Sequence, residues 1–189
     1  MSITEIDGVE LFFTDEGSGD PPMLFVHGFA CDSHDWSWQL AYFAARSRVI
    51  ALDLRGHGRS SVPMGGYEPL DFAADIAGLL DFLDCPPVVA MGHSMGALVV
   101  SVLAVEHPEK ICALVAADPA YLVDGALVDV AKLSTRLGSE DPVPLVQSLL
   151  GASDTPDTPP FLRTWHLRRV AGNAATRGHS HTRRHGKRV

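Results

Sequence analysis

Apolar and polar positions along this chain follow two alternating spacings. Four short runs are almost continuously apolar, which is typical of strands buried on both faces of a sheet: residues 23–26, 48–52, 86–91 and 111–118. Between them, apolar residues recur at helical spacing over residues 34–45, 69–83 and 97–107. An Asp-Gly turn between two strand-like runs predicts a hairpin over residues 3–22. This alternation predicts an α/β architecture, a mostly parallel sheet with helices on both faces.

The pattern changes after Tyr121. Short helices are predicted over residues 124–137 and 141–151, and a third begins in 161–170 after a loop rich in Pro, Thr and Asp. Beyond Val170 no large apolar residue appears before the last residue, so we expect disorder there. The chain therefore divides into a core over residues 1–121, a partial helical region over 122–170 and a basic disordered tail over 171–189.

The end of the chain differs from the rest most clearly in its charged residues. The chain has a formal net charge of −8, yet residues 161–189 contain no acid and eight basic residues. Residues 1–160 hold the other 7 basic residues and all 23 acidic ones. This abrupt change of composition is what translation in a shifted reading frame produces, and we interpret the tail in that way.

Composition also excludes several classes of protein. No run approaches the roughly 18 apolar residues of a membrane span, and the N-terminus lacks the basic start and apolar run of a signal peptide. We therefore expect a cytoplasmic protein with no membrane contact. The cysteines at 31, 85 and 112 lack any C-x-x-C pairing, which favours reduced thiols over a metal site or a disulfide framework.

The segment with the clearest chemistry is "GHSMG", residues 92–96. It follows a predicted strand directly and precedes a predicted helix directly, which is the setting of a nucleophile elbow. Ser94 is thereby predicted to be the nucleophile, its hydroxyl projecting over the C-terminal edge of the sheet. The backbone N–H of Met95 opens the following helix, where developing negative charge is favoured.

Two further segments, "FVHGF" and "ALDLRGHGRSS", precede "GHSMG" in an order and spacing that closely resemble the α/β-hydrolase superfamily. The likeness extends from about Ile3 to Val170 and is strongest to esterase and cofactor-free peroxidase-like members. It implies the α/β-hydrolase fold, with residues 122–170 as a partial cap, and an oxyanion hole formed by the N–H groups of Phe29 and Met95. It implies neither a cofactor nor a metal ion. Members that cleave epoxides or carbon–halogen bonds carry aspartate at the elbow, so Ser94 favours a small-molecule ester or similar acyl substrate, cleaved through an acyl-serine.

The same resemblance implies that an acid and then a histidine follow the serine along the chain. No strand is predicted after Asp118, so we expect the last strands of the fold, and the histidine that follows them, to be missing. Asp118 is the candidate acid, although an Asp-Pro turn that simply closes a strand explains it equally well. His57 is a poor candidate base, because the family places its base after the last strand. A flexible tail does not hold a base within hydrogen-bond reach, which disfavours the histidines at 166, 179, 181 and 185.

Several other residues have simpler structural interpretations. His27 and Gly28 are expected to shape their loop, and Asp53, Arg55, His57 and Arg59 to be one another's hydrogen-bond and charge partners. One of Trp36 and Trp38 is expected in the core, because residues two apart do not share a helical face.

Two alternative functions stay open. The first is a hydrolase-like binding module whose basic tail contacts an acidic partner; nucleic acid is disfavoured, because no aromatic residue is interleaved with the basic ones and residues 1–160 are strongly acidic. The second is cofactor-free peroxidase activity at the same site. The oligomeric state is left open, although an exposed sheet edge would favour pairing between chains.

Overall fold

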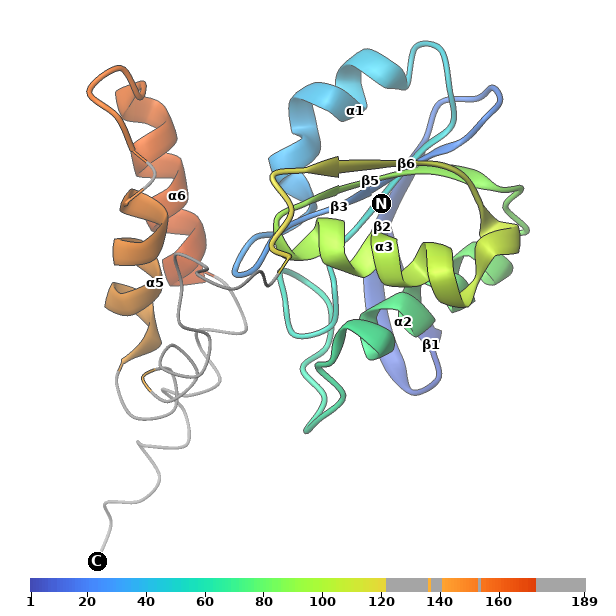
Figure 1. The fold of residues 1–189 in the computed structure, drawn as a ribbon, viewed down its shortest axis with the longest axis horizontal. Helices are drawn as coiled ribbons and strands as arrows, with labels where there is room; N and C mark the ends of the chain where they lie inside the picture. Colours follow the sequence, from blue (N-terminus) through green and yellow to red (C-terminus); the bar gives the residue numbers. More distant parts are fainter. Residues whose placement is uncertain (122–135, 137–140, 153, 173–189) are drawn as a thin grey trace, which may run out of the picture. The chain divides into compact units, whose positions relative to one another are not determined.

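The computed structural model describes residues 1–121, 136, 141–152 and 154–172 (Figure 1). The chain forms two compact units, residues 1–121 and 122–189. The first unit contains the strands β1 (Ser2–Ile6), β2 (Val9–Glu16), β3 (Met23–Val26), β4 (Val49–Leu52), β5 (Val88–His93) and β6 (Ile111–Ala117). Its helices are η1 (Ser33–Trp36), α1 (Ser37–Phe43), α2 (Pro69–Phe82), α3 (Met95–Glu106) and η2 (Pro108–Lys110). The second unit contains α5 (Pro142–Gly151) and α6 (Pro160–Gly172).

The strands of the first unit form one six-stranded sheet in the order β1-β2-β4-β3-β5-β6. β1 and β2 form the predicted antiparallel hairpin, and β2 also pairs antiparallel with β4. The four strands β4, β3, β5 and β6 are parallel to one another. Every residue of β3 and β4 is buried, because these central strands are covered on both faces. The predicted α/β architecture, a mostly parallel sheet with helices on both faces, is confirmed.

Helices lie on both faces of the sheet, α1 on one and α2 and α3 on the other (Figure 1), and each face carries an apolar layer. Leu24 and Val26 of β3 belong to the larger layer, with α2 and α3. Met23 and Phe25 point to the other face and belong to a smaller layer with Trp36, against which α1 packs. This division follows from the alternation of side chains along a strand.

The segment predicted as a helix over residues 34–45 is divided into the 3-10 turn η1 and the α-helix α1. The Asp32 carboxylate accepts a hydrogen bond from the His34 N–H at 2.9 Å and thereby caps the start of η1. Trp36 is buried, with its ring centroid 5.2 Å from that of Phe25, whereas Trp38 is 79% exposed. The core tryptophan is therefore Trp36.

The second unit contains two of the helices predicted after Tyr121. The Asp141 carboxylate caps α5 by accepting a hydrogen bond from the Val143 N–H at 3.0 Å. α6 continues to Gly172, so the expectation of disorder from residue 171 onward is wrong for Ala171 and Gly172, which complete the last turn of that helix. The predicted helix over 124–137, apart from Arg136, and the tail from 173 to 189 lie outside the described residues. The assignment of residues 122–170 as a cap remains a prediction.

None of the helices described is both long enough and apolar enough to cross a lipid bilayer. The cysteines form no disulfide within the described ranges. Among those same residues no cluster of metal-ligating side chains is found.

Candidate active site

Ser94 lies at the turn between β5 and α3 and has an unusual backbone conformation. Its φ of 52° and ψ of −116° lie in a region that residues with a side chain rarely adopt. Such a conformation costs on the order of 1–3 kcal/mol and persists only where the surrounding structure imposes it. Ser94 is half-buried, so its side chain is held at the edge of the sheet and not in the core. These are the features predicted for a nucleophile elbow.

The two glycines of the motif permit this turn. A Cβ atom on Gly92 would collide with the backbone carbonyl of Gly96, and one on Gly96 would collide with the carbonyl oxygens of Val26 and His27. The start of α3 therefore lies directly against the end of β3. Only residues without a side chain allow β5, the turn and α3 to approach so closely.

The loop after β3 reaches the serine from the neighbouring strand. A Cβ atom on Gly28 would stand 3.4 Å from the Ser94 Cβ and 3.2 Å from the His93 Nδ1. Phe29, the next residue, is 37% exposed. The structure therefore brings the loop that contains Phe29 against the turn that contains Ser94, as the predicted pairing of Phe29 and Met95 requires.

His27 holds this loop in place by hydrogen bonds at both ring nitrogens. Its Nδ1–H donates to the Gly28 carbonyl at 2.8 Å, and its Nε2 accepts from the Leu54 N–H at 3.0 Å. This pattern requires the neutral ring, because Nε2 must keep its lone pair. Burial, together with repulsion from a nearby His57, lowers the pKa of His27 to about 3. The prediction that His27 shapes its loop is confirmed.

Asp118 follows β6 just as Ser94 follows β5. His93 pairs with Ala117 in the parallel register of these strands, and the Ser94 N–H donates to the Ala117 carbonyl at 3.0 Å. Asp118 is thus placed beside the elbow, at the same edge of the sheet. It is exposed, has a positive φ of 45°, and its carboxylate has no hydrogen-bond partner among the described residues. Its backbone position fits the candidate acid, and it fits a strand-closing turn equally well.

The loop from Asp53 to Ser60 is a network of buried polar groups. The Asp53 carboxylate accepts hydrogen bonds from the Ser33 N–H at 2.8 Å and from the Arg59 Nε at 2.8 Å. Burial alone would raise the pKa of Asp53, but the hydrogen bonds from Arg59 and Ser33 outweigh it and hold the pKa below its usual range. The predicted partnership of Asp53 with Arg59 is confirmed.

Arg55 takes part in this loop only through its backbone carbonyl, and the expectation that its side chain pairs within the loop is wrong. Its guanidinium forms a bidentate pair with Asp75 of α2, with distances of 2.6 Å and 2.5 Å. Asp75 is 2% exposed and lies between Phe72 and Ile76 on the buried side of that helix. A carboxylate within an apolar helical stripe needs a cationic partner, and this was the signal in the sequence from which the pair could have been predicted.

His57 lies inside the same loop and beside the candidate oxyanion loop. Its Nδ1–H donates to the Arg55 carbonyl at 3.0 Å, and its ring centroid lies 6.2 Å from that of Phe29. Burial lowers the pKa of His57. No hydrogen bond joins it to Ser94 in the described part of the chain. Of the other candidate bases, His166 lies in α6 of the second unit, and the three tail histidines lie outside the described residues.

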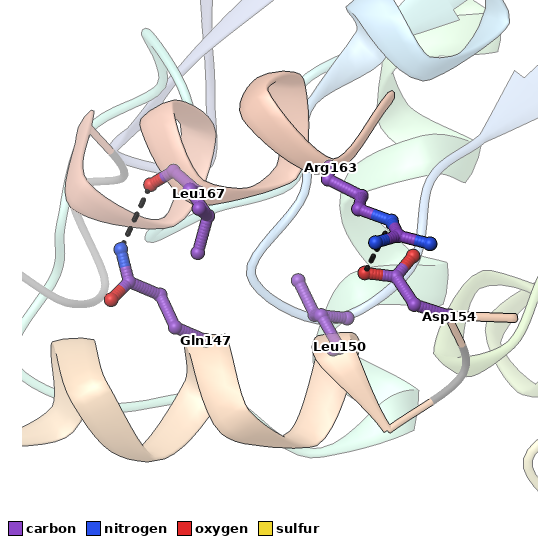
Figure 2. A pocket seen from close by; sticks show the side chains of 6 residues that line it. Gln147, Leu150, Asp154, Arg163 and Leu167 are labelled. Carbon is purple, nitrogen blue, oxygen red and sulfur yellow. Dashed lines mark hydrogen bonds and ion pairs between the residues drawn. The ribbon is translucent and has the colours of Figure 1, made fainter. Parts of the chain in front are cut away.

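A hollow of about 150 Å³ lies in the second unit, between α5 and α6 (Figure 2). It is bordered by a hydrogen bond from Gln147 Nε2 to the Leu167 carbonyl at 3.0 Å and by an ion pair between Arg163 and Asp154 at 3.8 Å. Leu150 fills the space between these two interactions (Figure 2). The hollow is a packing gap between two helices, and none of its lining residues was predicted as a site residue.

Comparison with known proteins places most of the chain in one family. Residues 21–171 match the family described as "alpha/beta hydrolase fold". A non-heme chloroperoxidase from Streptomyces lividans is 41% identical over 97 residues, which cover 50% of this chain and 35% of that protein. A bifunctional esterase/perhydrolase from Acinetobacter calcoaceticus is 35% identical over 126 residues, 64% of this chain and 46% of that protein. The chain thus spans less than half the length of both relatives.

The fold is similar to that of solved structures. The crystal structure of an enol-lactonase from Burkholderia xenovorans matches with a TM-score of 0.81 at 24% sequence identity. That match covers 89% of this chain and 67% of the lactonase chain. Because the sequence identity is low, this match supports a shared fold and no more.

Proposed function

Because this chain belongs to the α/β hydrolase fold family, we propose that it acts on esters or similar acyl substrates with Ser94 as the nucleophile. The observation that carries the proposal is the strained backbone of Ser94 between β5 and α3. The turn holds the hydroxyl at the carboxyl edge of the sheet, where a substrate carbonyl can approach it. Attack by Oγ would form a tetrahedral intermediate, whose collapse expels the alcohol and leaves an acyl-serine for water to hydrolyse.

The negative oxygen of that intermediate needs hydrogen-bond donors. α3 begins at Met95. The first N–H groups of a helix have no acceptor within the helix, so the Met95 N–H is available to a ligand. The Phe29 N–H belongs to the loop that reaches Ser94 through Gly28. We assign these two N–H groups to the oxyanion hole, where the helix N-terminus adds favourable potential.

The attack also requires a base that accepts the proton of the Ser94 hydroxyl. No side chain among the described residues forms a hydrogen bond to the Ser94 Oγ. Asp118, beside the elbow, is our candidate for the acid that would orient a base. Without a positioned base, an enzyme of this kind retains only roughly 10³–10⁴-fold catalysis over water, so we propose slow turnover for this chain.

Perhydrolysis is a second candidate activity, favoured by the similarity to the chloroperoxidase and to the esterase/perhydrolase. In that reaction hydrogen peroxide replaces water in attacking the acyl-serine and forms a peracid. It needs the same serine and the same N–H donors of the oxyanion hole. It is distinguished from ester hydrolysis by adding peroxide to an ester substrate and assaying the peracid formed.

A fluorophosphonate probe tests the nucleophile independently of turnover. The unmodified chain should be labelled at Ser94, and Ser94→Ala should abolish the labelling. Ser101→Ala, within the helix α3 that follows Ser94, is the matched control and should be labelled like the unmodified chain. Labelling of Ser94→Ala at the unmodified level would place the nucleophile elsewhere, and no labelling of any variant would show that the serine is not activated.

A further inference from the structure

The peptide unit between Gly28 and Phe29 is held by the protein at only one of its two polar groups. Its carbonyl oxygen, that of Gly28, accepts hydrogen bonds from the His27 Nδ1–H at 2.8 Å and from the Cys31 N–H at 3.2 Å. Its N–H, that of Phe29, has no acceptor among the residues that the structure describes. The carbonyl end is therefore fixed by two donors, while the N–H end remains available to a ligand.

Holding the carbonyl also fixes the direction of the N–H. This peptide is trans, and in a planar trans peptide the C=O and the N–H point in opposite directions. The restraint is needed because Gly28 has no side chain, so the backbone bond that turns its carbonyl rotates more freely than in other residues. A Cβ atom on Gly28 would stand 3.4 Å from the Ser94 Cβ. The restrained peptide therefore lies beside the elbow serine.

The side chain that holds this peptide is itself fixed from its other side. His27 is buried, and its Nε2 accepts a hydrogen bond from the N–H of Leu54, two residues beyond the end of β4. A carbonyl only accepts and a backbone N–H only donates, so both bonds require the neutral ring with its proton on Nδ1. The ring therefore has one orientation and one tautomer, and it ties the direction of the Gly28 carbonyl to the end of β4.

The turn that contains this peptide has a conformation that its surroundings impose. Ala30, the residue after Phe29, is buried and has a positive φ of 58°. A residue with a side chain rarely adopts such a φ and keeps it only where the rest of the structure requires it. The ring of His57 packs against the same turn, 5.2 Å from the ring of His27 and 6.2 Å from that of Phe29. The loop is thus held on both sides of the peptide.

We propose that His27 is a positioning residue for the oxyanion hole, because its hold on the Gly28 carbonyl directs the Phe29 N–H. The N–H then points to the substrate oxygen that becomes negative when Ser94 attacks. This role rests on the proposed function and adds a residue to it. His27 needs no contact with the substrate, because it acts only through the peptide. The two donors on the carbonyl also polarise this amide, which strengthens the N–H as a donor on the other side.

Two substitutions separate this role from a general contribution to stability. His27→Asn keeps an amide N–H near the position of Nδ1 and still donates to the Gly28 carbonyl. His27→Gln places its amide near the position of Nε2, where it keeps the bond to Leu54 and loses the bond to Gly28. Fluorophosphonate labelling of Ser94 should proceed at nearly the unmodified rate in His27→Asn and roughly 10²-fold more slowly in His27→Gln, the cost of losing one oxyanion-hole donor. Equal rates in the two variants, both folded by circular dichroism, would overturn the inference.

Nuclear magnetic resonance measures the direction of the N–H without any reaction at Ser94. The residual dipolar coupling of the Phe29 N–H should be the same in the unmodified chain and in His27→Asn, and different in His27→Gln. His34→Gln, which replaces a histidine whose side chain is 53% exposed, is the control and should leave the coupling unchanged. An unchanged coupling in His27→Gln would overturn the inference. Absent labelling of the unmodified chain, with the coupling changed as expected, would instead contradict the proposed function alone.

The ring nitrogens of His27 provide a test that needs no variant. Their chemical shifts in the unmodified chain should show a proton on Nδ1 and a lone pair on Nε2. The opposite tautomer has no proton to donate to the Gly28 carbonyl. Its observation would overturn the inference even if His27→Gln fails to fold.

Discussion

The imidazole rings of His27 and His57 lie 5.2 Å apart, and both side chains are almost closed to solvent. His27 uses both nitrogens within the fold, one as donor and one as acceptor, and it can do so only when neutral. The conformation of the loop beside Ser94 is therefore linked to the protonation state of a residue that takes no part in the proposed chemistry.

This link predicts that the protein loses stability as the pH falls through the range of histidine titration. Above pH 6.5 His27 is neutral in both the folded and the unfolded chain. Below it the unfolded chain binds a proton that the folded chain excludes until the pH reaches about 3, the pKa of His27 in the fold. The loss from this one group is about 2 kcal/mol at pH 5.

Urea unfolding at pH 7.5 and at pH 5 measures this loss. His27→Asn should reduce the difference between the two free energies of unfolding by about 2 kcal/mol. His34→Asn replaces a histidine whose side chain is 53% exposed and should retain the difference of the unmodified chain. An unchanged pH dependence in His27→Asn would contradict the link.

The ion pair between Arg55 and Asp75 is predicted to be essential for stability. Asp75→Ala leaves the Arg55 guanidinium, whose side chain is 12% exposed, without its bidentate partner, and should cost about 3 kcal/mol or more. Asp81→Ala is the matched control on α2, because Asp81 is 71% exposed and its pair with Lys110 should contribute at most about 1 kcal/mol. Chemical denaturation measures both values, and equal losses would show that burial of the pair does not matter.

Gly96→Ala is predicted to disrupt the elbow. The added methyl group would meet the carbonyl oxygens at the end of β3, which belong to backbone and not to a side chain that can rotate away. We expect a loss of about 1–3 kcal/mol and reduced fluorophosphonate labelling of Ser94. Gly65→Ala is the control, since a Cβ there meets no atom within 4 Å. Labelling of Gly96→Ala at the unmodified rate would show that the turn tolerates separation of α3 from β3.

Local patterns in the sequence were sufficient for much of the fold and for the identity of the candidate nucleophile. A run such as Met23–Val26 has no polar residue, which predicts a strand covered on both faces. The glycines on either side of Ser94 predict a tight turn. These features depend on residues that are neighbours along the chain. Spacing alone therefore identifies them.

Partners far apart in the sequence were decided by the tertiary structure. Arg55 and Asp75 are 20 residues apart, and only the packing of α2 against the sheet brings them together. The same holds for the choice between Trp36 and Trp38, because a 3-10 turn before α1 directs the first toward Phe25.

The sequence by itself determined the alternation of strands and helices, the elbow at Ser94 and the apolar character of β6. Only the tertiary structure decided that β6 is the outermost of the described strands beside β5, and that the loop of Phe29 reaches Ser94. The physical reason is that hydrophobic pattern and turn geometry act between neighbours in the chain. Strand order and burial instead follow from packing elements that are distant along it.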